Sequence, residues 1–402
     1  MTSSQKKEEL VAVFDIGSGS VGGALVLMPK GEPAKSFDFL ALQFEENKKP
    51  KPEILFTARA PIVFGPNLDF EVFLFEMSKA LETVASRLLS ARLGAPKKAY
   101  CFLAAPWCAT QTRVIKMERN TPFILTDKLL SDLSCREIKA FEEENAKRYP
   151  KGEKIRLLEG EIMQVKLNGY KTSDPYGKKT KSLEAALFAS IGSEQVLGAL
   201  EYHIGKFFNL DIDFHSFIFS AFAVTRDIFP EEKDFIFADV AGELTEIALV
   251  KDEALTESIT FPGGKNRFVR SLGLGLNKDI NEASSMFGLF LNKKAESKLA
   301  SRVADILKNP KSDWQYAFGH ALFEVAGKKS LPSKVFLTAD EDTALYLKSL
   351  IDGEELNQYT GTQSKFNVTI LKSQGLGPFA KLSSRAENDP FLIIESIFIN
   401  RI

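Results

Sequence analysis

Two short turns in the sequence combine a carboxylate with small residues that leave the backbone N–H groups accessible. The first reads Asp15-Ile-Gly-Ser-Gly-Ser, and the second reads Asp239-Val-Ala-Gly-Glu-Leu-Thr. Each lies between two apolar runs, so each is predicted to join two strands. Glycine lets backbone N–H groups approach phosphate oxygens, and a carboxylate can hold a hydrated magnesium ion. Two such turns facing each other would clamp a nucleotide.

The residues of these turns are the candidate nucleotide ligands. They are Asp15, Gly17, Ser18, Gly19 and Ser20 in the first turn and Asp239, Gly242 and Thr245 in the second. Asp15 and Asp239 are the expected metal residues, each through a water molecule, and ATP and Mg²⁺ are the expected cofactors. One turn of this kind is also typical of an ordinary glycine loop, but its repetition favours a binding site. No hydrolytic arrangement stands out, so catalytic residues stay unassigned and at most a weak ATPase is expected.

The elements around the turns indicate a duplicated architecture. Strand, Asp-containing turn and strand occur twice, about 220 residues apart, which predicts an α/β fold of two facing halves. Between residues 107 and 191 the order becomes strand, helix, strand, strand, which predicts a small α+β insert. In the second half, helices are expected over 277–308 and 314–326. The apolar segment from Pro390 to Ile402 is poor in lysine and suits a packed terminal helix better than a membrane-surface helix.

Composition excludes several classes of protein. Lys plus Arg total 52 and Asp plus Glu total 53, giving a formal charge of −1, and no basic run could neutralise a series of phosphates. We therefore expect no nucleic-acid partner. Cys101, Cys108 and Cys135 form no C-x-x-C pair, which argues against a disulfide framework or a zinc site and indicates a reducing compartment. No apolar run approaches the ~20 residues that span a bilayer.

At this point the sequence resembles a known family, the actin-like ATPase superfamily, and within it the cell-division protein FtsA and the pilus-assembly protein PilM. Residues 14–21 look like its phosphate-1 motif, residues 237–249 look like phosphate-2, and Phe261-Pro-Gly-Gly is similar to the Gly-Gly turn that follows. Gly263 and Gly264 join the candidate nucleotide-binding residues through this resemblance. Residues 168–185 are similar to a loop of subdomain 1C, an SHS2-type insert, in these proteins.

The resemblance implies an actin-like, ribonuclease H-like duplicated fold with four subdomains. Residues 10–106 and 193–230 would form subdomain 1A, and residues 107–192 subdomain 1C. Residues 231–265 and 335–402 would form subdomain 2A, and residues 266–334 subdomain 2B.

It also implies a cytoplasmic scaffold at the inner face of the cell membrane that recruits division or type IV pilus components. The partner at subdomain 1C would be an FtsZ-like polymer or a PilN-like peptide. Self-association into filaments is a further expectation, and membrane contact would pass through a partner.

Departures from the family pattern leave an alternative open. Ala241 replaces an expected glycine, and Glu243 brings a carboxylate near the phosphate position, where like charges repel. Ala339-Asp340 replaces a Gly-Gly pair of the adenosine motif, and Ser284 replaces a lysine of the adenine helix. The alternative is a pseudo-ATPase, an interaction module of the same fold that has lost nucleotide binding.

Overall fold

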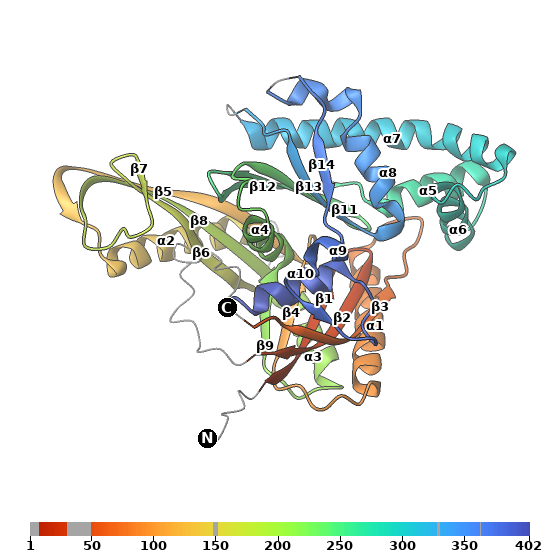
Figure 1. Cartoon of the computed structure of the whole chain (residues 1–402), viewed down its shortest axis with the longest axis horizontal. Coiled ribbons are helices and arrows are strands. Elements are labelled where there is room, and N and C mark those ends of the chain that lie inside the picture. The colour runs from red at the N-terminus through yellow and green to blue at the C-terminus, as the bar shows by residue number, and fades with distance from the viewer. Residues whose placement is uncertain (1–7, 30–49, 148–151, 328–329, 362) are drawn as a thin grey trace.

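The computed structural model describes residues 8–29, 50–147, 152–327, 330–361 and 363–402. Parts of the predicted subdomains, at 30–49, 148–151, 328–329 and 362, lie outside the described residues. The described chain forms two facing α/β halves and a projecting lobe (Figure 1). The predicted α/β fold with an inserted α+β unit is therefore confirmed.

Two sheets form the centres of the two halves. The strands of the first are β1 (Glu9–Ile16), β2 (Ser20–Met28), β3 (Glu53–Pro61), β4 (Ala99–Leu103), β9 (Ile212–Ser216) and β15 (Lys381–Leu382). The strands of the second are β10 (Phe235–Val240), β11 (Leu244–Lys251), β12 (Ala254–Pro262), β13 (Lys334–Ala339) and β14 (Asn367–Ile370). Apart from β15, the order β3-β2-β1-β4-β9 in one sheet matches β12-β11-β10-β13-β14 in the other.

The directions of the strands match as well. In each sheet the first three strands in sequence pair antiparallel, and the next two add in parallel on the other side. The register places Asp15 beside Phe102 of β4, and it places Asp239 beside Thr338 of β13. The two aspartates therefore hold equivalent positions at the ends of equivalent strands, as a duplication requires.

Helices cover the outer faces of both sheets and fill the space between them. They are α1 (Phe70–Ser90), α3 (Glu194–Gly205), α4 (Phe217–Ile228), α5 (Lys265–Leu276), α6 (Ile280–Leu291), α7 (Ser297–Ala326), α8 (Glu341–Ile351), η1 (Glu354–Tyr359), α9 (Ser373–Leu376) and α10 (Pro390–Ile399). Helices α1 and α3 cover the first sheet, α7 and α8 cover the second, and α5 and α6 pack against α7 and α8. Helices α4 and α10 lie between the sheets (Figure 1).

A single apolar core joins the two halves. It contains Val11 and Val26 from the first sheet, Phe237 from the second, Phe219 from α4 and Ile394 from α10, all almost fully buried. Burial of a large apolar side chain stabilises the fold by about 1.5–3 kcal/mol. The halves therefore share one core in this structure instead of meeting only across a solvent-filled cleft.

The projecting lobe is the inserted unit. Its elements are β5 (Cys108–Ile124), α2 (Asp127–Ala146), β6 (Ile155–Leu167), β7 (Tyr170–Thr172) and β8 (Lys179–Ser193). They form a sheet with the order β5-β8-β6-β7, and α2 packs on one face. Glu159 of β6 anchors this lobe to the first sheet, because it accepts hydrogen bonds from Ser190 Oγ (2.7 Å) and from Ser216 Oγ of β9 (2.6 Å).

Two expectations about the second half differ from the structure. Helix α7 runs unbroken from Ser297 to Ala326 through Pro310, and a separate α6 precedes it, so the predicted helices 277–308 and 314–326 were wrong in their boundaries. A proline inside a helix costs about 3 kcal/mol. Here Leu307 and Trp314 on either side of Pro310 are buried in another apolar core, which lies between α7 and the second sheet. Their burial offsets that cost.

The last part of the chain belongs with the first sheet. The sequence predicts residues 335–402 in the second half, but β15 pairs with β3, and α10 packs against α4 and β1. The prediction of a packed terminal helix is confirmed, since Leu392 to Ile399 are all buried. Across the described ranges, no helix combines the length and the apolar character needed to cross a bilayer.

Candidate functional site: a closed junction between two glycine turns

The first glycine turn is the tight connection between β1 and β2. The Gly17 N–H donates to the Ser20 carbonyl (3.1 Å), and the Trp107 side chain donates to the Gly17 carbonyl (2.8 Å). Asp15 closes β1 with only 3% of its surface exposed, and Ser18 is fully buried. The Gly17–Ser20 and Trp107–Gly17 hydrogen bonds therefore hold this turn in place.

The second glycine turn, between β10 and β11, rests on the Gly263-Gly264 pair. The Thr245 hydroxyl donates to the Gly263 carbonyl (2.6 Å), and a Cβ atom on Gly264 would lie 2.3 Å from the Ala241 carbonyl oxygen. Only glycine fits at position 264. Thr245, Gly263 and Gly264 thus support the second turn from beneath, and none of them lines the cavity between the turns.

The two turns touch each other directly. A Cβ atom on Gly242 would lie 2.4 Å from Gly19 Cα and 2.7 Å from the Ser18 carbonyl oxygen. The Glu243 N–H donates to Ser18 Oγ (3.0 Å) across the junction. The cavity left beside the contact is about 20 Å³, which holds about one water molecule.

Asp15, Gly17, Gly19, Ser20, Asp239 and Gly242 line this small cavity, so the structure brings the predicted turns together. Their role as nucleotide ligands stays a prediction.

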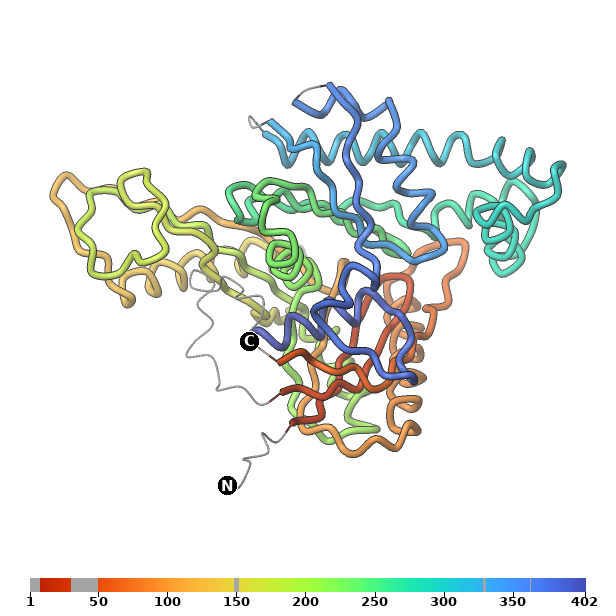
Figure 2. The backbone as a smooth tube through the Cα atoms, viewed as in Figure 1, coloured from red at the N-terminus to blue at the C-terminus, as the bar shows by residue number. Residues whose placement is uncertain are grey.

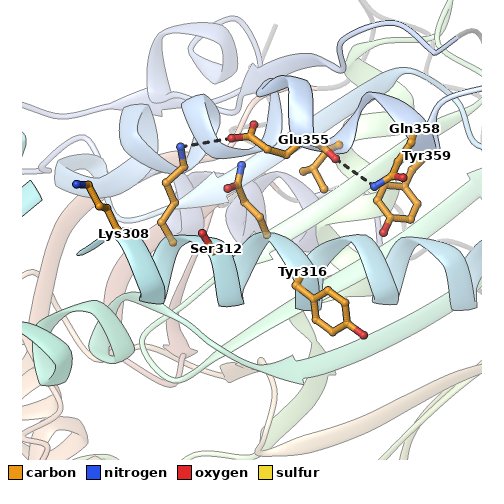
Figure 3. A pocket seen from close by; sticks show the side chains of 9 residues that line it. Lys308, Ser312, Tyr316, Glu355, Gln358 and Tyr359 are labelled. Carbon is orange, nitrogen blue, oxygen red and sulfur yellow. Dashed lines mark hydrogen bonds and ion pairs between the residues drawn. The ribbon is translucent and has the colours of Figure 1, made fainter. Parts of the chain in front are cut away.

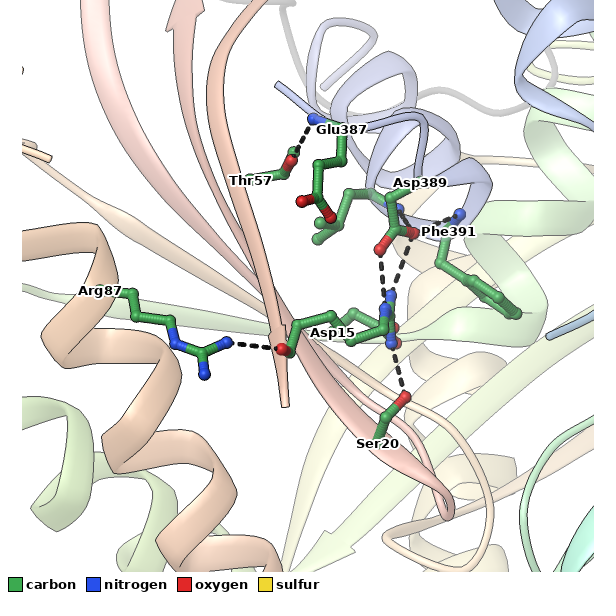
Figure 4. A network of polar contacts seen from close by, with 9 residues as sticks. Asp15, Ser20, Thr57, Arg87, Glu387, Asp389 and Phe391 are labelled. Carbon is green, nitrogen blue, oxygen red and sulfur yellow. Dashed lines mark hydrogen bonds and ion pairs between the residues drawn. The ribbon is translucent and has the colours of Figure 1, made fainter. Parts of the chain in front are cut away.

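Arg59 of β3 occupies the side of this junction near Asp15. Its guanidinium group donates to Asp15 Oδ2 (2.7 Å), to Ser20 Oγ (2.8 Å) and to both oxygens of Asp389 (2.7 and 3.0 Å). Figure 4 shows Ser20 and Asp389 on opposite sides of this group. A Cβ atom on Gly22 would lie 2.6 Å from the guanidinium nitrogen, so the group fits closely against β2.

Sequence analysis missed Arg59 and Asp389. Burial opposes the charge of Arg59, but Asp389 and Asp15 together raise its pKa well above the usual value. A signal was present, since Arg59 is the one charged residue in the otherwise uncharged run 54–68, and a charge in a buried strand requires a partner. That partner is 330 residues away in sequence, which no local pattern could reveal.

The Glu243 carboxylate points away from the junction. It pairs with both terminal nitrogens of Arg270 on α5 (2.7 Å each) and accepts from Asn266 (2.7 Å). Arg270 also donates to the Gly65 carbonyl of the first half (2.8 Å), so this group spans the two halves. Arg270 therefore neutralises the charge of Glu243 and removes the expected repulsion of phosphate. It also forms a second contact between the halves.

Two carboxyls of the second half are buried at the junction. Burial raises the pKa of Asp239 to about 8, against the hydrogen bond from Thr338 (2.7 Å). Burial likewise raises the pKa of Glu246, its neighbour on β11, to about 7, against a hydrogen bond from Thr110 of the insert (3.1 Å). Both carboxyls therefore keep a proton in the folded protein to a higher pH than an exposed carboxyl does.

The adenosine side of the predicted site is also altered. Lys265 forms ion pairs with Asp340 (3.1 Å) and Asp342 (2.8 Å), which fixes its ammonium group beside α8. Ser284 is exposed on α6 and brings no positive charge. These positions therefore carry Ala339-Asp340 and Ser284, where the resemblance implied a glycine pair and a lysine.

A magnesium-bound triphosphate does not fit between the turns as they stand. The turns are in backbone contact, the Glu243 N–H already has Ser18 as its acceptor, and Arg59 covers the carboxylate of Asp15. Over the described ranges, no group of three or more His, Cys, Asp or Glu side chains could hold a metal ion. The backbone contact, the Ser18–Glu243 hydrogen bond and the Arg59–Asp15 ion pair close this junction in the structure.

A larger groove lies elsewhere, between α7 and η1. Its volume is about 520 Å³, and its walls carry Lys308, Ser312 and Tyr316 from α7 and Glu355 and Tyr359 from η1 (Figure 3). Lys311 forms an ion pair with Glu355 (3.7 Å) inside it. None of the residues of the two turns lines this groove, so it is separate from the predicted site.

Comparison with known proteins agrees with this architecture. No family model matches the sequence, and no curated protein matches it significantly. Among solved structures, the chain is similar to a chain of a PilM–PilN type IV pilus biogenesis complex, at 12% identity, with a TM-score of 0.62 over 98% of this chain and 99% of the other. The chain has an actin-like fold.

Two further solved structures match the chain with lower TM-scores. The ethanolamine utilization protein EutJ from Carboxydothermus hydrogenoformans is 11% identical, with a TM-score of 0.43 over 99% of this chain and 91% of that one. MreB 5 of Spiroplasma citri, solved with bound AMPPNP, is 9% identical, with a TM-score of 0.42 over 92% and 93%. Of the three, only the PilM–PilN chain has a TM-score above 0.5, and at 12% identity it shows the fold alone.

The contact between the turns predicts a large effect of a single methyl group in the actin-like chain. We expect Gly242→Ala to lower the free energy of unfolding by about 2 kcal/mol or more, because its Cβ would overlap Gly19 and Ser18. Chemical denaturation measures this change. Gly198→Ala on α3 is the control, since open space surrounds that position and the substitution favours the helix. Equal stability of the two variants would contradict the contact.

The pKa of Asp239 predicts how stability depends on pH. Because its folded-state pKa of about 8 lies above that of the unfolded chain, the folded state binds the extra proton. The contribution of Asp239 is therefore present at low pH and is lost as pH rises towards 8. Between pH 5 and 7, Asp239 should make the unfolding free energy of the wild-type chain fall by about 1.4 kcal/mol for each unit that the pH rises. We expect Asp239→Asn to remove this part of the slope. Denaturation of both proteins at several pH values checks this, and identical slopes would disprove it.

Proposed function

We propose that this chain is an actin-fold scaffold that binds a protein partner without nucleotide, that is, a pseudo-ATPase. The observation that carries the proposal is the backbone contact between Gly19 and Gly242, which takes the space that phosphate would need. The fold supports this class of function, because the likeness to a chain of a PilM–PilN complex extends over nearly the whole molecule.

Contacts away from the turns also hold the halves together without a ligand. Thr112 of the insert donates to the Leu255 carbonyl of β12 (3.0 Å), and Lys171 pairs with Glu253 (2.8 Å). The insert therefore binds the second half as well as the first. Since these bonds and the shared core already connect the halves, a nucleotide has no bridging role to fill.

The insert is the proposed docking site of the partner. It projects from the body of the molecule (Figure 2), and it carries large exposed side chains. Tyr170 on β7 is 80% exposed, Ile124 at the end of β5 is 57% exposed, and Tyr176 is 39% exposed. Aromatic side chains of this kind are enriched at the centres of protein interfaces.

We infer a role in type IV pilus assembly, with a peptide of a PilN-like protein as the partner. The likeness to the PilM–PilN chain supports pili over cell division and an FtsZ-like polymer. Placement at the inner face of the membrane would then come from that partner. The burial of α10 supports this, because its apolar side chains are already covered by the protein's own core.

Nucleotide binding provides the first test. We expect millimolar Mg·ATP to leave the melting temperature unchanged, since a ligand that does not bind the folded state cannot stabilise it. Differential scanning fluorimetry and titration calorimetry measure this directly. Saturable binding that disappears in both Asp15→Ala and Asp239→Ala would contradict the proposal and establish a nucleotide-dependent scaffold instead.

Partner binding provides the second test. We expect Tyr170→Ser combined with Tyr176→Ser to weaken the binding of a PilN-like peptide about tenfold or more, because exposed aromatic anchors carry much of the energy of an interface. Tyr316→Ser is the control, since Tyr316 is 74% exposed on α7 of the second half. Fluorescence anisotropy with a labelled peptide reports the affinity. An equal loss in the control, or no loss in the double variant, would place the docking site elsewhere.

A further inference from the structure

The position of Arg59 suggests a role beyond closing the junction. Its side chain is about one quarter exposed, whereas Asp15 and Asp389 on either side of it are 4% and 12% exposed. Removal of one partner from a buried ion pair leaves an uncompensated charge and is strongly destabilising. Arg59 is therefore the counter-ion on which two carboxylates depend.

A third carboxyl adds to the negative character of this place. Glu395 of α10 is fully buried, and within the described part of the chain neither of its carboxyl oxygens has a hydrogen-bond partner. Burial raises the pKa of Glu395 well above its usual value, and the charge of Asp15 raises it further. Arg59 thus lies near three acidic side chains, Asp15, Asp389 and Glu395.

The guanidinium group also connects the end of the chain to the first glycine turn. Asp389 is the N-cap of α10, where its Oδ1 accepts from the N–H groups of Phe391 (3.1 Å) and Leu392 (3.3 Å). The same carboxylate receives two bonds from Arg59, and the Phe391 ring lies 5.2 Å from the guanidinium carbon. One side chain thereby links the start of α10 to Ser20 and Asp15.

The segment before α10 follows β3 towards the same point. The Ser383 hydroxyl donates to the Leu55 carbonyl (2.6 Å), and the Glu387 N–H donates to Thr57 Oγ1 (2.6 Å). Figure 4 shows Thr57, Glu387 and Asp389 along this path. The contacts of this segment along β3 therefore end at Arg59. Of the three contacts at Leu55, Thr57 and Arg59, only the one at Arg59 joins charged side chains.

We propose that Arg59 is an internal cation that takes the place of a metal-bound ligand at the first glycine turn and fastens α10 to that turn. This proposal rests on the proposed function, because it requires that no nucleotide competes for this place. The consequence is that the C-terminal helix and the junction open together or stay closed together. A partner that displaced α10 would loosen the two turns.

A double-mutant cycle tests the charge relation. We expect Arg59→Ala to lower the melting temperature by about 5 °C or more. Asp389→Asn should lower it less, and the double variant should lose less than the sum, because Asp389 is harmful once its cation is gone. Arg113→Ala is the matched control, since Arg113 pairs with Glu137 and Glu144 on the insert surface. Additive losses would overturn the proposal.

Chemical rescue tests the identity of the cation. Millimolar guanidinium chloride, far below denaturing concentrations, should raise the melting temperature of Arg59→Ala relative to equal sodium chloride and should not raise that of Arg113→Ala. Rescue of both variants, or of neither, would overturn the proposal.

Hydrogen exchange tests the coupling and does not need the Arg59 variant to fold. In Asp389→Asn, amides of residues 17–20 and 391–399 should exchange faster together, and those of α2 should not change. Unchanged exchange at residues 17–20 would overturn the proposal, whatever the Mg·ATP titration shows. Conversely, ATP binding by the wild-type chain would overturn the proposed function and leave this coupling measurable.

Discussion

The backbone contact between Gly19 and Gly242 determines how the two halves of this molecule meet. Glycine at such a turn removes the Cβ atom that would keep another group at a distance. In a nucleotide-binding protein that space admits a phosphate oxygen, whereas here it admits the opposite turn. The Ser18–Glu243 hydrogen bond and the Arg270 bridge form beside this contact, and the shared core joins the halves farther from it. The same glycines therefore serve closure as well as they would serve ligand binding.

Carboxylates left in such a junction need other partners, because a buried unpaired charge is costly. The structure meets this requirement in three ways. Asp15 is paired with Arg59, and Glu243 is paired with Arg270. Asp239 is neutralised by a proton, as its raised pKa indicates. The presence of an aspartate in each turn is thus compatible with a site that carries no metal, because Arg59 and a proton neutralise these carboxyls instead.

Sequence reasoning reached the fold but not the state of the site. The repeated strand, turn and strand around Asp15 and Asp239 are local patterns, so the duplication and the insert could be predicted from them. Arg59 and Asp389 are 330 residues apart, and only the folded chain brings them together. Helix α7 crosses Pro310 because buried neighbours outweigh a local penalty, which is a tertiary effect. The distance between the turns could not be predicted from the sequence. That distance decides whether the turns clamp a nucleotide or close on each other.

The pairing of β15 with β3 and the packing of α10 against β1 have a consequence for biosynthesis. Domains usually fold as units in the order in which the ribosome makes them. Here the first sheet lacks the edge strand β15 and the helix α10 until residues 381–399 emerge. The second half, whose strands all precede residue 371, can assemble while the first is still incomplete. The first sheet is therefore begun before the second and completed after it, and a chain that lacks α10 would expose the apolar face of β1.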